Sequence, residues 1–306
     1  MITLASLLTL AGCVRYEDGR AAFDNRDYPT AFAKWQLLAK FGDAKAQNEL
    51  GWLYQNGLGT DLDVGMAVLW YRKAASQGLT VAQTNLGIMF NDGIGVPRNP
   101  GEAAKWFELA ARQGDPSALN NLGVLYDKGD GVPEDDRKAV ELLTRAAELG
   151  HPRAMSNLGL MYRLGEGVPQ DAVTATRWFK AAADEKDLEG INNLGVMLDQ
   201  GIGTAQDRTK AMSLFDTAAR AGHPDAAVNL AMMMMHPPAN LLPPQERGSA
   251  RPLVTAYAWL NFAAGLGNLE ARQYRAELHP KLSSDEIAEA QRLSVAWSSK
   301  ARSPIN

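Results

Sequence analysis

Few residues of this chain have the type and spacing that catalysis or metal binding requires. The four histidines are His151, His223, His236 and His279. They form no His-x-x-x-His pair, the helical spacing typical of a zinc site. No Ser-x-x-Lys or Gly-x-Ser-x-Gly sequence supplies a nucleophile for acyl transfer. We therefore expect no catalytic residue, no metal site and no cofactor, and an enzyme such as a hydrolase is the disfavoured class.

A run of four methionines, Met232–Met235, precedes His236 and offers soft ligands of the kind that copper(I) prefers. Four consecutive residues of a helix point all round its axis, so only Met232 and Met235 would share a side. Methionine more commonly fills irregular gaps in an apolar core. Core filling is the favoured interpretation of this run.

Gly-x-Gly occurs five times at intervals of 36 residues, for example at Gly129-Asp130-Gly131. A dinucleotide site needs these glycines after a strand and at the start of a helix, with a third glycine. Here every copy follows a helical pattern. The sequence therefore predicts loops in which glycine permits a positive φ, and no nucleotide site.

The most regular feature of the chain is a Leu-Gly pair that recurs every 36 residues. It occurs at Leu50-Gly51, Leu86-Gly87, Leu122-Gly123, Leu158-Gly159 and Leu194-Gly195, and the next copy is Leu230-Ala231. A fixed period of roughly 20–50 residues is the signature of a solenoid or another repeat array. The 306 residues are therefore expected to form one array, in which each repeat contacts mainly its neighbours.

Each repeat predicts two helices. The first has an apolar stripe such as Ala103, Phe107 and Ala111, begins at Asn99 as the N-cap and ends at Gly114. The equivalent caps are Asp63, Asp135, Asp171 and Asp207, and the equivalent glycines are Gly42, Gly78, Gly150 and Gly222. Lys186 interrupts the glycine series.

The second helix contains the Leu-Gly pair. A mid-helix glycine costs about 1 kcal/mol relative to alanine, so its recurrence predicts that a neighbouring helix approaches closely there. Asparagine also recurs at Asn85, Asn121, Asn157, Asn193 and Asn229. A residue present in each repeat is more readily part of the scaffold than of a site.

The pattern Ala-x-x-x-Leu-Gly-x-x-Tyr/Phe, a Gly-x-Gly loop, and Ala-x-x-Trp-Tyr/Phe-x-x-Ala-Ala resembles the Sel1-like repeat, a relative of the tetratricopeptide repeat. The resemblance implies an all-α fold, a right-handed α/α superhelical solenoid of about seven helix pairs with a terminal capping helix. We place the array at 28–303, after a tether or N-terminal capping helix at 13–27. The units lie near 28–60, 61–96, 97–132, 133–168, 169–204 and 205–236, followed by a Pro-rich loop at 237–252 and a last unit with its cap at 253–303.

The only cysteine, Cys13, follows a short apolar stretch that is too short to span a bilayer. The sequence Leu10-Ala11-Gly12-Cys13 resembles a bacterial lipobox, which implies a signal peptide at 1–12 and lipidation of Cys13. Val14 rather than Asp follows, which by analogy implies the periplasmic face of the outer membrane. No Lys or Arg precedes the apolar stretch, as a secretory signal usually requires. A chance apolar N-terminus with a free thiol, or a soluble periplasmic protein, is the alternative.

A net charge of −4 provides no basic surface for nucleic acid. We expect a non-catalytic scaffold or regulator of the cell envelope that holds a protein partner in its concave face. Departures from the repeat are the candidate contacts: Trp52, Lys186, His236, Pro238 and Pro244. The alternatives are an immunity protein that neutralises a secreted toxin and a periplasmic ligand-binding module.

Overall fold

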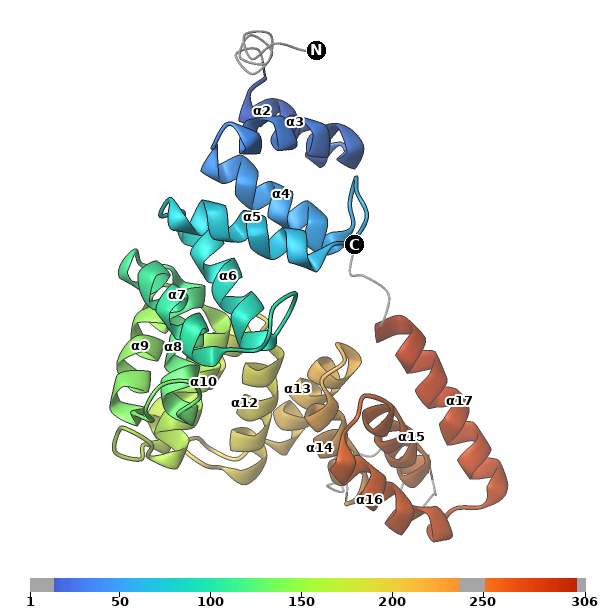
Figure 1. The fold of residues 1–306 in the computed structure, drawn as a ribbon. Helices are drawn as coiled ribbons and strands as arrows, with labels where there is room; N and C mark the ends of the chain where they lie inside the picture. The colour runs from blue at the N-terminus through green and yellow to red at the C-terminus, as the bar shows by residue number, and fades with distance from the viewer. Residues whose placement is uncertain (1–13, 237–250, 302–306) are drawn as a thin grey trace. The chain divides into compact units, whose positions relative to one another are not determined.

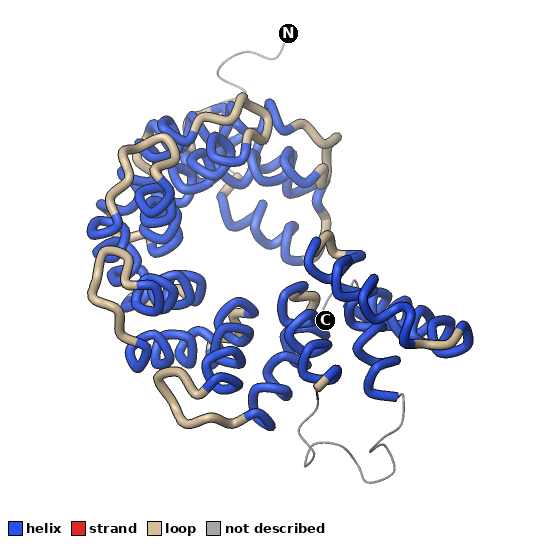
Figure 2. The backbone as a smooth tube through the Cα atoms, turned by 90° about the horizontal axis from the view of Figure 1, so that it is seen from below, coloured by secondary structure: helices blue, strands red, loops and turns tan. Residues whose placement is uncertain are grey.

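A computed structural model describes residues 14–236 and 251–301 of the chain, and these residues contain helices and loops but no strand (Figure 2). The described part contains no helix that is both long and apolar enough to cross a membrane. The all-α fold expected from the repeat is therefore confirmed.

The chain divides into two compact units, residues 1–151 and 152–306 (Figure 1). The helices of the first unit are α2 (Tyr16–Asp24), α3 (Tyr28–Lys40), α4 (Ala44–Asn56), α5 (Val64–Ser76), α6 (Thr80–Asp92), α7 (Pro100–Arg112), α8 (Pro116–Lys128) and α9 (Asp136–Glu148). The helices of the second unit are α10 (Pro152–Leu164), α11 (Ala172–Asp184), α12 (Leu188–Gln200), α13 (Arg208–Arg220), α14 (Pro224–Met235), α15 (Arg251–Gly265), α16 (Leu269–Leu278) and α17 (Ser284–Ala301), with a 3₁₀ turn at His279–Lys281 between the last two. Within each unit, every even-numbered helix from α4 to α14 packs closely against the odd-numbered helix that follows it.

The predicted N-caps are confirmed by their hydrogen bonds. The side chain of Asn99 accepts from the backbone N–H of Glu102, which satisfies one of the donors that the first turn leaves unpaired. Asp63, Asp135, Asp171 and Asp207 make equivalent bonds at the starts of α5, α9, α11 and α13. Local chemistry within three or four residues thus sets where these helices begin.

The turn from each odd helix to the next even helix contains one residue in the left-handed region. Gly42, Gly78, Gly114, Gly150 and Gly222 have φ between +82° and +96°. Lys186 occupies the same position after α11 and has φ +63°, although it has a Cβ. The repeat therefore imposes this backbone conformation on Lys186, which L side chains rarely adopt.

The Leu-Gly pair packs where close approach was predicted. A Cβ built on Gly87 would lie 2.5 Å from the ring of Phe107, and one built on Gly159 would lie 2.6 Å from the ring of Phe179. Tyr71, Leu143 and Phe215 lie against Gly51, Gly123 and Gly195 in the same way. In each of these five repeats, the missing side chain makes room for a bulky residue of the following odd helix.

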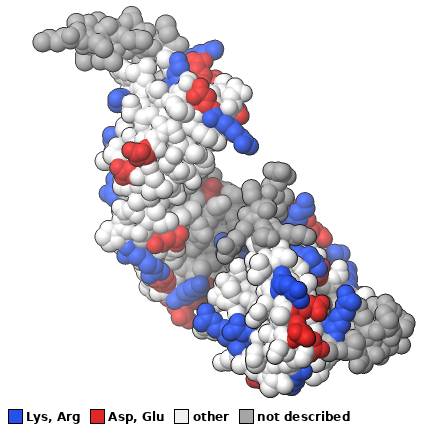
Figure 3. All heavy atoms as spheres, turned by 90° about the vertical axis from the view of Figure 1, so that its right-hand side faces the viewer, with Lys and Arg blue, Asp and Glu red and all other residues white. Residues whose placement is uncertain are grey.

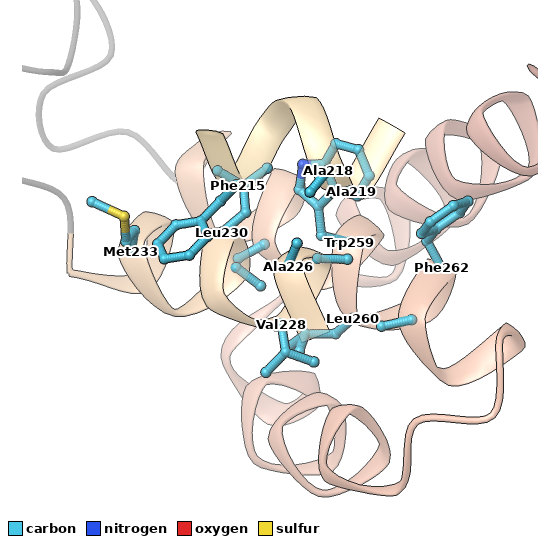
Figure 4. Packing of buried hydrophobic residues seen from close by; sticks show 14 of the residues in the cluster. Phe215, Ala218, Ala219, Ala226, Val228, Leu230, Met233, Trp259, Leu260 and Phe262 are labelled. Atoms are coloured by element: carbon cyan, nitrogen blue, oxygen red, sulfur yellow. The ribbon is translucent and has the colours of Figure 1, made fainter. Parts of the chain in front are cut away.

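The second unit ends in a core that departs from this pattern (Figure 4). At α14, Ala231 replaces the glycine, and Leu260 of α15 occupies the position that holds Tyr or Phe in four of the five earlier repeats. Both side chains are fully buried in one cluster. Met233 is buried in this cluster and Met232, Met234 and Met235 pack against it, which confirms the core-filling interpretation of the methionine run.

Candidate protein-binding surface

The even helices carry a half-buried apolar side chain at the residue after the Leu-Gly glycine position, at a spacing of 36 residues. We call these side chains the apolar row. The row comprises Trp52, Ile88 and Val124 in the first unit and Leu160, Val196 and Met232 in the second. Each lies one residue after the position of the Leu-Gly glycine, on a helix whose other apolar side chains are largely buried. The apolar row is therefore a regularly spaced stripe of partly exposed apolar surface that these helices can offer a partner.

The recurrent asparagines lie three residues before the apolar row, on the same helices and about one turn away. Asn85 Nδ2 donates to Asn48 Oδ1 over 3.1 Å, and Asn229 Nδ2 donates to Asn192 Oδ1 over 2.9 Å. Each bond joins an even helix to the even helix of the preceding repeat. In these two copies the asparagine holds repeats together, as the scaffold interpretation predicts.

A second set of amides ties the repeats of the first unit together. Gln77 Nε2 donates to Gln47 Oε1, and Gln113 Nε2 donates to Gln83 Oε1, each over 2.8 Å. Gln47 and Gln83 are buried and also donate to backbone carbonyls at the ends of α3 and α5. These contacts were not predicted, although the sequence shows that Gln83 follows Gln47, and Gln113 follows Gln77, by 36 residues.

The second unit has a hydrogen-bonded His–Glu pair between the first turns of α14 and α12. His223 is the N-cap of α14, and its Nδ1 accepts from the backbone N–H of Ala226. The ring proton therefore lies on Nε2, 3.1 Å from Glu189 Oε2, to which it donates. This hydrogen bond is the main cause that lowers the pKa of the half-buried Glu189 carboxyl.

The described candidate contact residues lie in different environments. Trp52 is half-buried, and its ring meets that of Phe23 in α2 edge to face at a centroid distance of 5.3 Å. Lys186 is exposed in the turn between α11 and α12. His236 is exposed as the C-cap of α14. Of these residues, Trp52 alone is part of the apolar row.

Cys13, Pro238 and Pro244 lie outside the described residues. The predictions that concern them, lipidation and a Pro-rich contact, remain predictions.

Charge is mixed along the described surface. On the face shown in Figure 3, basic and acidic side chains are interspersed rather than gathered into a patch of one sign. Several pair locally, such as Arg112 with Glu108 and Arg220 with Asp216 at i,i+4 spacing. Such exposed ion pairs contribute little to stability. The side chains that recur along the repeats on the even helices are the apolar row and the asparagines.

Comparison with known proteins agrees with this architecture. The profile of the Sel1 repeat matches residues 44–79, 80–115, 116–151, 152–187 and 188–223. Each match begins at an even helix and ends with the turn after the next odd helix. A putative Sel1-like repeat-containing protein of Acanthamoeba polyphaga mimivirus is 43% identical over 42 residues, which is 14% of this chain and 8% of that protein.

Two solved structures are similar over most of the chain. A Sel1 repeat protein from Oxalobacter formigenes is 29% identical with a TM-score of 0.73, over 81% of this chain and 96% of that one. The protein c5321, a protective antigen present in uropathogenic Escherichia coli strains, is 30% identical with a TM-score of 0.68, over 98% of this chain and 72% of that one. With five profile matches that cover more than half of its length, the chain belongs to the Sel1 repeat family.

Proposed function

We propose that this protein is a non-catalytic scaffold that binds a protein partner along its even helices. Sel1 repeat proteins are commonly scaffolds for protein interactions. The observation that supports the proposal here is the apolar row, in which a half-buried apolar side chain follows an asparagine by three residues in five successive repeats.

The apolar row and the asparagines next to it suit an extended segment of a partner protein. The apolar side chains are already partly desolvated, and covering what remains gains about 25 cal/mol per Å² of apolar area. The asparagine amides can donate to and accept from the peptide groups that an extended chain leaves unpaired. Under this proposal, the concave face expected from the family resemblance corresponds, within each unit, to this side of the even helices.

A photo-activated cross-linking residue placed at Val124 tests this surface. Val124 lies in the apolar row of α8, and the matched control is Leu109, which is 41% exposed on the odd helix α7 of the same unit. We expect a discrete cross-linked partner from position 124 and none from position 109. Equal cross-linking from both positions would contradict the assignment of the binding side.

We further propose that the protein acts in the cell envelope, anchored by acyl chains on Cys13. The support is the lipobox-like Leu10–Cys13 sequence, in which the single cysteine of the chain occupies the lipidated position. Labelled palmitate should be incorporated into the parent protein and not into Cys13→Ala, and globomycin should make a larger, uncleaved precursor accumulate in the membrane fraction. Absence of label in the parent protein and an unchanged size under globomycin would exclude the anchor, and they would leave the binding surface untouched.

A further inference from the structure

The last repeat contains a polar pocket that the repeat pattern does not predict. It has a volume of about 470 Å³ and is bounded by α15, α16, the 3₁₀ turn and α17 of the second unit. It is lined by Tyr257, Asn261, Arg275, Ala276, His279 and Gln291. The volume lies within the range of small-ligand pockets. Arg275 is the one fully ionised side chain in this lining, and no carboxylate is part of it.

Asn261 has a donor with no partner. Its Oδ1 accepts from Arg275 Nη1 over 3.2 Å, while its Nδ2 is buried and unpaired among the described residues. Rotating the amide by 180° would not repair this, because it would set Nδ2 against the guanidinium, which can only donate. The bond to Arg275 therefore fixes the amide with its donor unused. A buried unpaired donor is unfavourable, so a rearrangement of the pocket that brings an acceptor to this donor lowers the free energy.

A second polar pair lies in the same pocket. The hydroxyl of the buried Tyr257 lies 2.9 Å from His279 Nδ1, and the two rings are 5.9 Å apart between centroids. When the hydroxyl donates to Nδ1, the ring proton lies on Nε2 and becomes a further donor. The contact holds the imidazole in place at the exposed edge of the pocket.

We propose that this pocket binds a carboxylate group. The guanidinium of Arg275 supplies the positive charge and a planar set of N–H donors, and the buried Nδ2–H of the adjoining Asn261 becomes a further donor once a bound ligand opens access to it. Two adjacent donors match the two oxygens of a planar carboxylate. A phosphate dianion would leave its second charge unmatched by this single cation. The pocket is separate from the apolar row, so the proposal does not depend on the proposed scaffold function.

The carboxylate can belong to a small acid or to the C-terminus of a peptide. Binding of succinate, acetate, inorganic phosphate and a tripeptide with a free or an amidated C-terminus is measured by NMR titration of the full chain. We expect succinate, acetate or the free-acid tripeptide to shift the amide resonances of α15 and α16, with dissociation constants at or below about 1 mM for the best of them. Tighter binding of the free-acid tripeptide than of succinate assigns the pocket to chain termini, and the reverse assigns it to small acids.

Asn261→Asp tests the unpaired donor. This variant keeps an acceptor for Arg275 but replaces the donor by an oxygen and adds a negative charge beside the guanidinium, so carboxylate affinity should fall at least about tenfold. Arg275→Gln should cause a similar loss of carboxylate affinity. Arg275→Lys should cause a smaller loss, because lysine keeps the positive charge but lacks the planar pair of N–H donors of the guanidinium. Arg272→Gln is the matched control, since Arg272 is an exposed residue of α16 outside the lining. Thermal unfolding of each variant shows whether it is folded, and if Arg275→Gln is not, Arg275→Lys and Asn261→Asp carry the test.

Three outcomes would overturn the proposal. The first is the absence of any resonance shift with every carboxylate probe at concentrations up to about 20 mM, well above the largest dissociation constant expected. The second is undiminished carboxylate binding by folded Asn261→Asp. The third is tighter binding of phosphate than of every carboxylate. An equal loss in Arg272→Gln and Arg275→Gln would also contradict it, because it would reduce the effect to the net charge of α16.

Discussion

The ring of Phe107 lies against the backbone of Gly87, so that a Cβ on the glycine would come 2.5 Å from ring carbon Cε1. Gly87→Ala should therefore destabilise the first unit. Overpacking typically costs 1–3 kcal/mol, and the better helix propensity of alanine returns about 1 kcal/mol. We expect a net loss of up to about 2 kcal/mol in the free energy of unfolding from urea denaturation.

Gly123→Ala provides the control for this prediction. The neighbour there is Leu143, whose atoms would lie 2.9 Å or more from the new Cβ and belong to a flexible side chain. Its cost should be smaller than that of Gly87→Ala. The double variant Gly87→Ala/Phe107→Leu reproduces the Ala231 and Leu260 combination of the sixth repeat and should recover part of the loss. Equal costs at both glycines would show that ring contact is not the cause.

Lys186→Gly should stabilise the second unit by about 1 kcal/mol, because it removes the strain of a Cβ at a left-handed position. Lys186→Ala removes the charge but keeps the Cβ, so its stability should stay close to that of the parent. Chemical denaturation of the three proteins separates the two effects. If alanine stabilised the protein as much as glycine, the charge and not the backbone would be responsible.

Acid should weaken the second unit through Glu189. Its pKa in the folded protein is lowered from the ordinary value of 4.5, chiefly by the hydrogen bond from His223, with smaller contributions from Asn193 and Arg153. A lowered pKa contributes stability that is present above pH 4.5 and is lost as the pH falls through the folded value. We therefore expect the urea midpoint to decline below about pH 4.5 in part because of this carboxyl.

His223→Asn tests this cause, because asparagine can still cap α14 but cannot reach Glu189 as the imidazole does. The Glu189 pKa, followed by carbon NMR of its carboxyl, should rise toward 4.5 in the variant. Asp216→Asn is a control, since Asp216 pairs with Arg220 and not with Glu189. An unchanged Glu189 pKa in His223→Asn would assign the shift to other groups.

Trp52→Ala should release the N-terminal helix α2, because the Trp52 ring packs edge to face on Phe23. Such aromatic pairs contribute about 0.5–1.5 kcal/mol beyond the area they bury. Hydrogen exchange of amides 16–24 should become faster in Trp52→Ala and in Phe23→Ala. Val124→Ala, at the equivalent position two repeats later, should leave these amides unchanged, and slow exchange in Trp52→Ala would contradict the contact.

This contact also affects how binding data are interpreted. Loss of a partner in Trp52→Ala could follow from the loosened helix, whereas Val124 has no such neighbour in α2. The binding surface is therefore better tested at Val124 than at the larger and more conspicuous tryptophan.

The sequence predicted the features that depend on nearby residues or on the period. Asn99 and Asp63 cap helices by bonds that span three residues, and the Gly87 contact recurs because the period places an equivalent residue opposite each glycine. The predicted start of α15 was less accurate, because the helix begins at Arg251, within the loop that was expected to extend to residue 252. The register had already been broken there, so only local propensity remained as a guide.

The carboxylate pocket could not have been predicted in this way. Asn261 and Arg275 are 14 residues apart on separate helices, and no other repeat has an equivalent pair. Their meeting depends on how α15 and α16 pack, which neither capping residues nor periodicity specify. The unpaired amide becomes visible only when the hydrogen bonds of the folded protein are counted.

The glycine turns have a consequence for how such a gene can change in length. In four of the Gly-x-Gly loops the second glycine lies close to the start of an odd helix, and a Cβ on Gly95 would lie 2.5 Å from the carbonyl oxygen of Val64. An insertion of a few residues there would break the contact, whereas duplication or deletion of one 36-residue segment recreates a junction of the same kind. Recombination between neighbouring repeat sequences can therefore lengthen or shorten the protein by whole repeats without disturbing the contacts between repeats. The surface available to a partner changes in length with it.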